Sequence, residues 1–163
     1  MKYKKQRGQE RKLKSLIKNI QDIVPFEDTS LPFEHFHVPC GPFISSPKTS
    51  SKIKTAFCKA WIKKTESIIK QKPSDLPFCK AVALIDSTEL WDSQIIIFYS
   101  EDHYRSFWDR NTPEQLWTLI DNTEKSFAKE HNIKTELNEI CYSQTITEDD
   151  LNKTSTLWFY EEI

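Results

Sequence analysis

Two histidines and a cysteine lie close together in residues 34–40, which read EHFHVPC. Side chains alternate along an extended strand, so His35 and His37 are predicted to share one face, with Phe36 and Val38 on the other. A His-x-His pair of this kind offers three kinds of chemistry. It can supply two ligands to a metal ion, act as a general acid and base, or form part of a polar binding surface.

A metal site needs more ligands than this stretch supplies, because zinc takes three or four from the protein. The further candidates are Cys40 and Asp86, and acid–base catalysis would draw on His35, His37 and Asp86. The chain has no HExxH, GxSxG or CxxC motif, and its two glycines cannot form a glycine-rich phosphate loop. We therefore predict no metal and no cofactor, and we favour binding over catalysis.

A second polar group is expected where two apolar segments meet. Asp86 ends one of them, Ser93 and Gln94 begin the next, and Trp91 lies in the connection. These side chains either tie the connection to the backbone or form a recognition edge. A third group, which could hold an anion such as phosphate, combines the two histidines with Lys48 and Arg110.

The elements that must position these residues follow from hydrophobic periodicity and turn signals. Helices are predicted over residues 3–24, 50–71, 101–110, from 113 and over 123–131. Strands are predicted over 34–39, 79–86, 94–100, 136–146 and 155–163. The last two strands flank a polar loop, residues 147–155. The strands around residues 82–85 and 95–98 are apolar on both faces, which predicts that both faces are covered.

This order, αβαββα(α)ββ, predicts one α+β domain over residues 1–163. A basic amphipathic helix occupies residues 1–24, and residues 33–163 hold a mixed, mainly antiparallel sheet of about five strands covered by helices. A ferredoxin-like βαββαβ core can be traced inside the order as one alternative.

The sequence also indicates a compartment. No apolar run is long enough to span a bilayer, and the basic start lacks the apolar centre of a secretory signal. The four cysteines are scattered through apolar segments and are predicted to be reduced and mostly buried: Cys40, Cys58, Cys79 and Cys141. We therefore expect a cytoplasmic protein with no membrane partner.

Charge is unevenly distributed along the chain. Residues 1–85 carry 17 Lys/Arg against 7 Asp/Glu, whereas residues 86–163 carry 6 against 17, for a net charge of −1. Five basic residues follow helical spacing on the polar face of the first helix: Lys4, Arg7, Arg11, Lys14 and Lys18. This basic stripe is either a solvated face or a contact for nucleic acid or an acidic protein.

The acidic half is rich in aromatic side chains, and such surfaces suit protein partners. Its candidate binding residues are Trp91, Ser93, Gln94, Tyr104, Trp108, Arg110, Trp158 and Tyr160. A basic partner would be steered toward a face of this kind by electrostatic attraction.

Several segments together resemble an uncharacterised domain family of unknown function from Bacillus and related Firmicutes. They are KYKKQRGQERKLK, HFHVPCGPFISSPKT, ALIDSTELWDSQIIIFYSEDHYRSFWDRN, the pair Gln115 and Trp117, and the terminal WFYEEI. The resemblance implies a small cytosolic bacterial or phage protein, and it implies no particular activity.

The favoured hypothesis is a protein-binding module of the immunity or antitoxin type, or a regulator in phage–host conflict. Its partner would be a basic toxin or a host or phage factor. The alternative is a nucleic-acid-binding protein that uses the basic first helix. A second alternative is a hydrolase or nucleotide-handling enzyme that uses His35 and His37. A homo-oligomer remains open.

Overall fold

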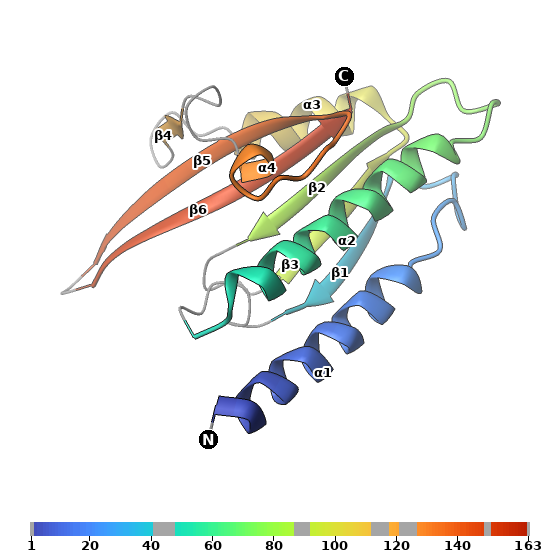
Figure 1. The fold of residues 1–163 in the computed structure, drawn as a ribbon. Coiled ribbons are helices and arrows are strands. Elements are labelled where there is room, and N and C mark those ends of the chain that lie inside the picture. The colour runs from blue at the N-terminus through green and yellow to red at the C-terminus, as the bar shows by residue number, and fades with distance from the viewer. Residues whose placement is uncertain are drawn as a thin grey trace.

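The computed structural model describes residues 2–40, 48–86, 92–111, 118–120, 127–148 and 151–162. Their elements, in chain order, are α1 (Lys2–Gln21), β1 (Phe33–Pro39), α2 (Ser51–Lys70), β2 (Lys80–Asp86), β3 (Asp92–Phe98), α3 (Glu101–Asn111), β4 (Thr118–Ile120), α4 (Phe127–Glu130), β5 (Leu137–Glu148) and β6 (Leu151–Glu162) (Figure 1). The predicted α+β class is confirmed.

The strands form a sheet in the order β1-β3-β2-β6-β5-β4, and every neighbouring pair is antiparallel. The strands β1 and β2, which α2 connects, run parallel to each other with β3 between them. This arrangement is the first half of a ferredoxin-like core. The second half differs, because β6 pairs with β2 and β1 is left as the outermost strand.

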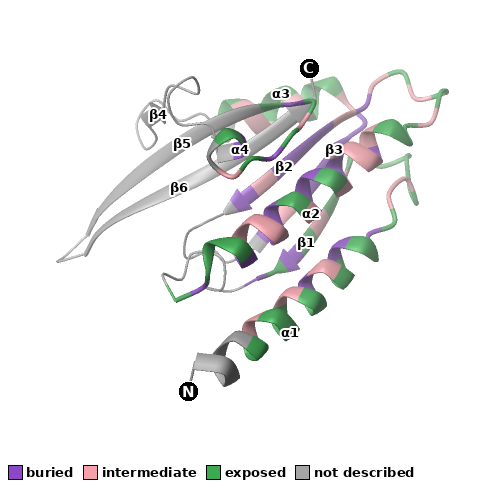
Figure 2. Ribbon diagram, in the orientation of Figure 1, coloured by how far each residue is buried: buried purple, intermediate pink, exposed green. Residues whose placement is uncertain are grey.

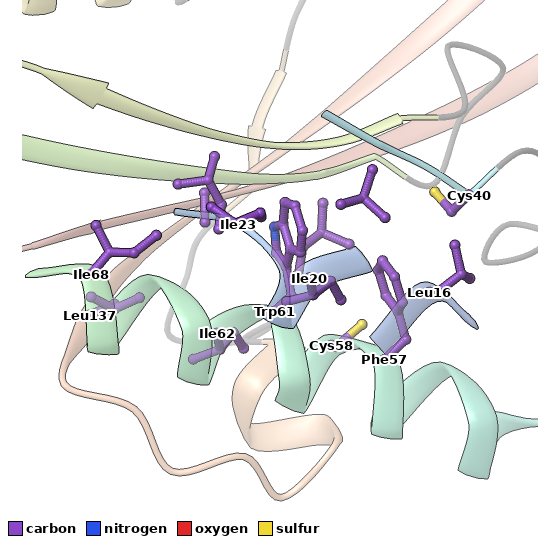
Figure 3. Packing of buried hydrophobic residues seen from close by; sticks show 14 of the residues in the cluster. Leu16, Ile20, Ile23, Cys40, Phe57, Cys58, Trp61, Ile62, Ile68 and Leu137 are labelled. Carbon is purple, nitrogen blue, oxygen red and sulfur yellow. The ribbon is translucent and has the colours of Figure 1, made fainter. Parts of the chain in front are cut away.

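Helices cover both faces of the central strands, as predicted. The helices α1 and α2 lie side by side on one face and α3 lies on the other (Figure 1). On the α1–α2 side, Phe57 and Trp61 of α2 are fully buried against Ile95 and Ile97 of β3 in one large apolar cluster (Figure 3). The α3 side has a smaller cluster.

The predicted boundaries of the first two helices hold to within a few residues. Apolar residues spaced three or four apart turn one face of α1 inward, and Leu16 and Ile20 are buried there. The helix ends at Gln21, before Pro25, and its last carbonyls are capped from α2. The Lys64 ammonium donates hydrogen bonds to the carbonyl oxygens of Gln21 (3.2 Å) and Ile23 (2.7 Å).

Two predictions about the second half were wrong. Residues 118–120 are a short strand rather than the end of a helix, because they pair with residues 141–143 of β5. The helix predicted over 123–131 is confirmed at α4, and residues 121–126 lie outside the described residues. The loop predicted over 147–155 is largely strand, since β5 and β6 pair from Leu137 opposite Glu162 to Glu148 opposite Leu151. Pairing along this ladder outweighs the local turn signals.

Three of the four cysteines are buried and reduced, which confirms the prediction for Cys40, Cys58 and Cys79. Burial, with a smaller contribution from Cys40, raises the pKa of the Cys58 thiol to about 12. Such a thiol stays protonated and unreactive at neutral pH. In the described part of the chain, no helix is long and apolar enough to cross a membrane.

Candidate functional site

The two histidines of β1 share one face, as the alternation predicted. Their rings are 3.9 Å apart between centroids, and both side chains are exposed. His35 Nε2 lies 2.9 Å from Oε1 of Gln94, so this nitrogen carries the proton in that hydrogen bond. Desolvation lowers the pKa of His35, the bond to Gln94 opposes this, and His37 lowers the pKa further.

The proposed third metal ligands do not join the two histidines. Cys40 is buried in the core, where its sulfur lies 3.7 Å from the hydroxyl oxygen of Ser93. Cys40 therefore lies on the core side of the strand, away from the exposed imidazoles. Asp86 ends β2, and its side chain lies outside the described residues. Among the described side chains, no group of three or more His, Cys, Asp or Glu is placed to hold a metal ion.

The expected group around Asp86, Ser93 and Gln94 is divided by the sheet. Ser93 is fully buried beside Cys40, on the core face of the strand. Gln94 lies on the opposite face, where its side-chain oxygen accepts a hydrogen bond from His35. The two residues alternate along β3, which explains why neighbours in sequence serve different faces. Trp91 lies outside the described residues.

The aromatic residues of α3 are used for packing. Tyr104 and Trp108 are half-buried, and they pack on the cluster formed by Val82, Ile96 and Phe98. Tyr104 stacks edge-on against Phe98, with ring centroids 5.5 Å apart. The α3 aromatics therefore form the cover of this sheet face.

The remaining aromatic candidates lie on β6. Trp158 pairs with Ile85, and Tyr160 pairs with Ala83. Both partners belong to the core cluster on the α1–α2 side, whereas Tyr104 and Trp108 lie on the α3 side. The side chains of Trp158 and Tyr160 lie outside the described residues.

The proposed anion group is also divided. Lys48 is exposed next to α1, where its carbonyl oxygen accepts a hydrogen bond from the Gln9 amide (2.7 Å). Arg110 belongs to α3, on the other side of the sheet, and its side chain lies outside the described residues. The fold therefore places the backbones of Lys48 and Arg110 on opposite sides of the sheet.

The basic stripe of α1 is exposed where its side chains are described, at Arg7, Arg11, Lys14 and Lys18. Lys4 belongs to the same helix, and its side chain lies outside the described residues. The apolar residues of α1 pack inward on the opposite face of the helix. The α1 stripe, defined by these four described residues, therefore points away from the sheet.

A second stripe lies on α2, and sequence reasoning missed it. Its members are exposed and seven, four and seven residues apart: Lys52, Lys59, Lys63 and Lys70. At 3.6 residues per turn these positions fall on one line, opposite the buried face that holds Phe57, Trp61 and Ile68. The spacing alone could have revealed this α2 stripe.

The two stripes lie in one layer. The helices α1 and α2 run side by side in the same direction on one face of the sheet (Figure 1), and both outer surfaces are exposed (Figure 2). Together the helices carry fourteen Lys/Arg and two Asp/Glu. Within the described residues, Lys70 is the one stripe member with an ion pair, to Glu136 at 3.4 Å. We call this surface the basic layer.

A half-buried carboxylate that was also missed fixes the segment between α1 and β1. Glu34 accepts hydrogen bonds from the backbone amides of Phe26 (2.8 Å) and Asp28 (3.0 Å) and from the Tyr99 hydroxyl (2.8 Å). Phe26 has a left-handed backbone, with φ of 65°. Burial and the neighbouring Glu34 raise the pKa of Tyr99 well above its usual range. This network is structural, because its polar atoms satisfy one another.

Comparison with known proteins places the chain in a family. A family model described as "Protein of unknown function (DUF3916)" matches residues 14–162, so the chain belongs to this family. The match confirms the resemblance to an uncharacterised domain family. No curated protein and no solved structure matched the chain.

Proposed function

We propose that this protein binds nucleic acid through the basic layer of α1 and α2. The proposal rests on one observation. The helices α1 and α2 lie side by side, and each has a row of Lys and Arg side chains on its outer surface. Nucleic-acid backbones are recognised by clustered Lys and Arg, and the binding is driven by the release of counterions. This function was the alternative hypothesis from the sequence, and the second stripe now makes it the stronger one.

The near-neutral net charge is compatible with this function because the charges are segregated in space. The acidic residues described on α3, Glu101, Asp102 and Asp109, lie across the sheet from the basic layer. Exposed charges separated by more than about 8 Å are largely screened at physiological ionic strength. A polyanion at the basic layer therefore experiences mainly its positive charge.

The basic layer suits a duplex backbone. None of the exposed residues described on α1 and α2 is aromatic, so the layer has no platform for stacking unpaired bases. The α2 stripe from Lys52 to Lys70 is about 27 Å long at 1.5 Å per residue. This length matches about eight base pairs of duplex at 3.4 Å each. Contacts to phosphates alone predict binding without sequence preference.

The protein-binding hypothesis based on the acidic aromatic half has less support from the described residues. Two of its candidate binding residues, Tyr104 and Trp108, pack on the sheet and cover it. The enzyme hypothesis rests on His35 and His37. The His35 ring is hydrogen-bonded to the side-chain oxygen of Gln94, and in the described part of the chain no group of three or more His, Cys, Asp or Glu is placed to hold a metal ion. The basic layer is the more specific feature.

The proposal is tested with charge-reversal variants of equal net charge. Lys59→Glu with Lys63→Glu reverses two exposed members of the α2 stripe, and Lys80→Glu with Arg105→Glu makes the same change on the α3 side. Binding to a fluorescent mixed-sequence duplex of about 20 base pairs, longer than the footprint estimated above, is measured by anisotropy.

We expect the α2 variant to bind at least about tenfold more weakly, because two phosphate contacts become repulsive. The α3-side variant should bind like the wild type. Equal weakening in both variants would show that net charge alone matters and would contradict the proposed surface. Absence of duplex binding by the wild type at low salt would overturn the function itself.

A further inference from the structure

A groove of about 490 Å³ lies between the end of α1 and the strand β1. Its described lining comes from the last turn of α1, from the segment that follows this helix, and from residues 35–37 of β1. None of the described residues of the α1 stripe or the α2 stripe lines it. The volume falls within the range of small-molecule sites, about 300–1,000 Å³.

The groove is negatively charged. Asp22 and Glu27 are exposed carboxylates in its lining, and the described lining has no Lys or Arg. Within the described part of the chain, neither carboxylate has an ion pair. The Lys64 ammonium donates to the carbonyl oxygens of Gln21 and Ile23, and Lys64 is not part of the lining. A cation in the groove is therefore attracted by two carboxylates.

Apolar residues separate the two carboxylates along the chain. Ile23 and Val24 directly follow Asp22 and line the groove, and Phe36 of β1 also belongs to the lining. Val24 is 57% exposed, the largest exposed fraction among the large apolar side chains described. A ligand that covers Val24 removes apolar surface from water, and this burial favours binding.

The His35 imidazole adds a hydrogen-bond acceptor to the lining. Its Nε2 donates to Oε1 of Gln94, so Nδ1 carries the lone pair of the neutral ring. Desolvation lowers the pKa of His35, so the ring is neutral at pH 7 and adds no positive charge to the groove. A neutral ring of this tautomer can accept a hydrogen bond from an ammonium group.

We propose that this groove binds a small aliphatic diamine, a chain of methylene groups with a protonated amine at each end. One ammonium group pairs with Asp22 and the other with Glu27, while the methylene chain covers Ile23 and Val24. The ligand therefore repeats the order of the lining, in which a charge, an apolar stretch and a second charge follow one another. The site does not depend on the basic layer, whose charge has the opposite sign.

The test uses 1,5-diaminopentane, titrated into the full-length protein at pH 7 and low salt while the backbone amide signals are followed by NMR. Pentylamine has a chain of the same length with one charge, and 1,5-pentanediol has no charge. We expect the diamine to shift the amides of Asp22, Val24 and Glu27 and to bind about threefold more tightly than pentylamine, because it forms a second exposed ion pair. Pentanediol should leave these amides unshifted.

Matched variants locate the site. Asp22→Asn with Glu27→Gln removes both carboxylates and should weaken diamine binding by about tenfold. Asp75→Asn with Asp109→Asn makes the same change in net charge on exposed residues outside the lining, and it should bind the diamine like the wild type.

Three outcomes would overturn the proposal. Equal weakening in the two double variants would mean that the diamine responds to net charge and not to the groove. A shift of the same amides with pentanediol would mean that the carboxylates do not select the ligand. The third is a titration with the diamine that leaves the amides of Asp22, Val24 and Glu27 unshifted.

Discussion

The α1–α2 side and the α3 side of the sheet differ in what they bury and in what they expose. On the α1–α2 side, large side chains such as Phe57 and Trp61 are completely buried, and the outer surface carries Lys and Arg. On the α3 side, Tyr104, Phe107 and Trp108 are only half-buried over three buried residues. The aromatic side chains of α3 are needed to close the fold, whereas most of the basic stripe residues have no ion pair in the described structure. This difference in burial and surface charge is the reason that we propose the α1–α2 side as the binding surface.

The largest expected effect tests the difference in burial. Phe57→Ala removes a fully buried ring and should lower the free energy of unfolding by about 3–5 kcal/mol. Phe107→Ala removes a half-buried ring on the α3 side, so its cost should be roughly half as large. Urea denaturation followed by circular dichroism measures both. Equal costs would show that the two sides are packed equally well.

The next effect separates stability from binding within the basic layer. Lys64→Met removes the two hydrogen bonds that cap α1, and should cost about 1–2 kcal/mol of stability and reduce amide protection at the end of the helix. Lys63→Met, one residue earlier, should change stability by less than about 0.5 kcal/mol. Hydrogen exchange and urea denaturation provide the measurements. If Lys63→Met destabilises as much as Lys64→Met, the α2 stripe has a structural role.

An effect of similar size concerns the segment that joins α1 to β1. Glu34→Gln replaces a carboxylate that accepts from two backbone amides and the Tyr99 hydroxyl. We expect a loss of about 1–2 kcal/mol, because charge-assisted hydrogen bonds are replaced by weaker ones. Glu27→Gln, on an exposed residue nearby, is the control for urea denaturation. A neutral result for Glu34→Gln would mean that the left-handed turn at Phe26 holds by itself.

The smallest effect is a pH dependence from His35. Its pKa is lowered from the usual 6.5, so the unfolded chain binds more protons than the folded protein between the two values. The stability contribution of the neutral imidazole is complete above about pH 6.5 and is lost as pH falls through the lower pKa of folded His35. Subtracting the stability curve of His35→Gln from the wild-type curve between pH 4 and 8 isolates this contribution. A difference independent of pH would contradict the lowered pKa.

Much of the fold through α3 could be predicted from the sequence because its apolar periodicity is strong. Apolar residues spaced three or four apart marked α1 and α2, and continuous apolar runs marked β2 and β3. The second half was harder, because the residues after Ile146 read as a polar loop and become strand only through the ladder between β5 and β6. The pairing of Thr118 with Ser143 is similarly non-local.

The candidate sites were predictable only in part. Alternation correctly placed His35 and His37 on one face, and helical spacing correctly placed the α1 stripe. The alignment of Lys59 and Lys63 was visible in the spacing of α2, but the proximity of α2 to α1 depends on how both helices pack on the sheet. The role of Glu34 depends on the left-handed backbone of Phe26, for which a phenylalanine gives no local signal.

The salt dependence of duplex binding tests the central claim most directly. The dissociation constant is measured over a range of KCl concentrations for the wild type and for a variant in which Arg11, Lys18, Lys59 and Lys63 are all replaced by Gln. Each lost phosphate contact flattens the slope of log K against log salt by about 0.9, so the account predicts a change of up to about 3.6. A slope equal to that of the wild type would show that the basic layer does not contact the nucleic acid.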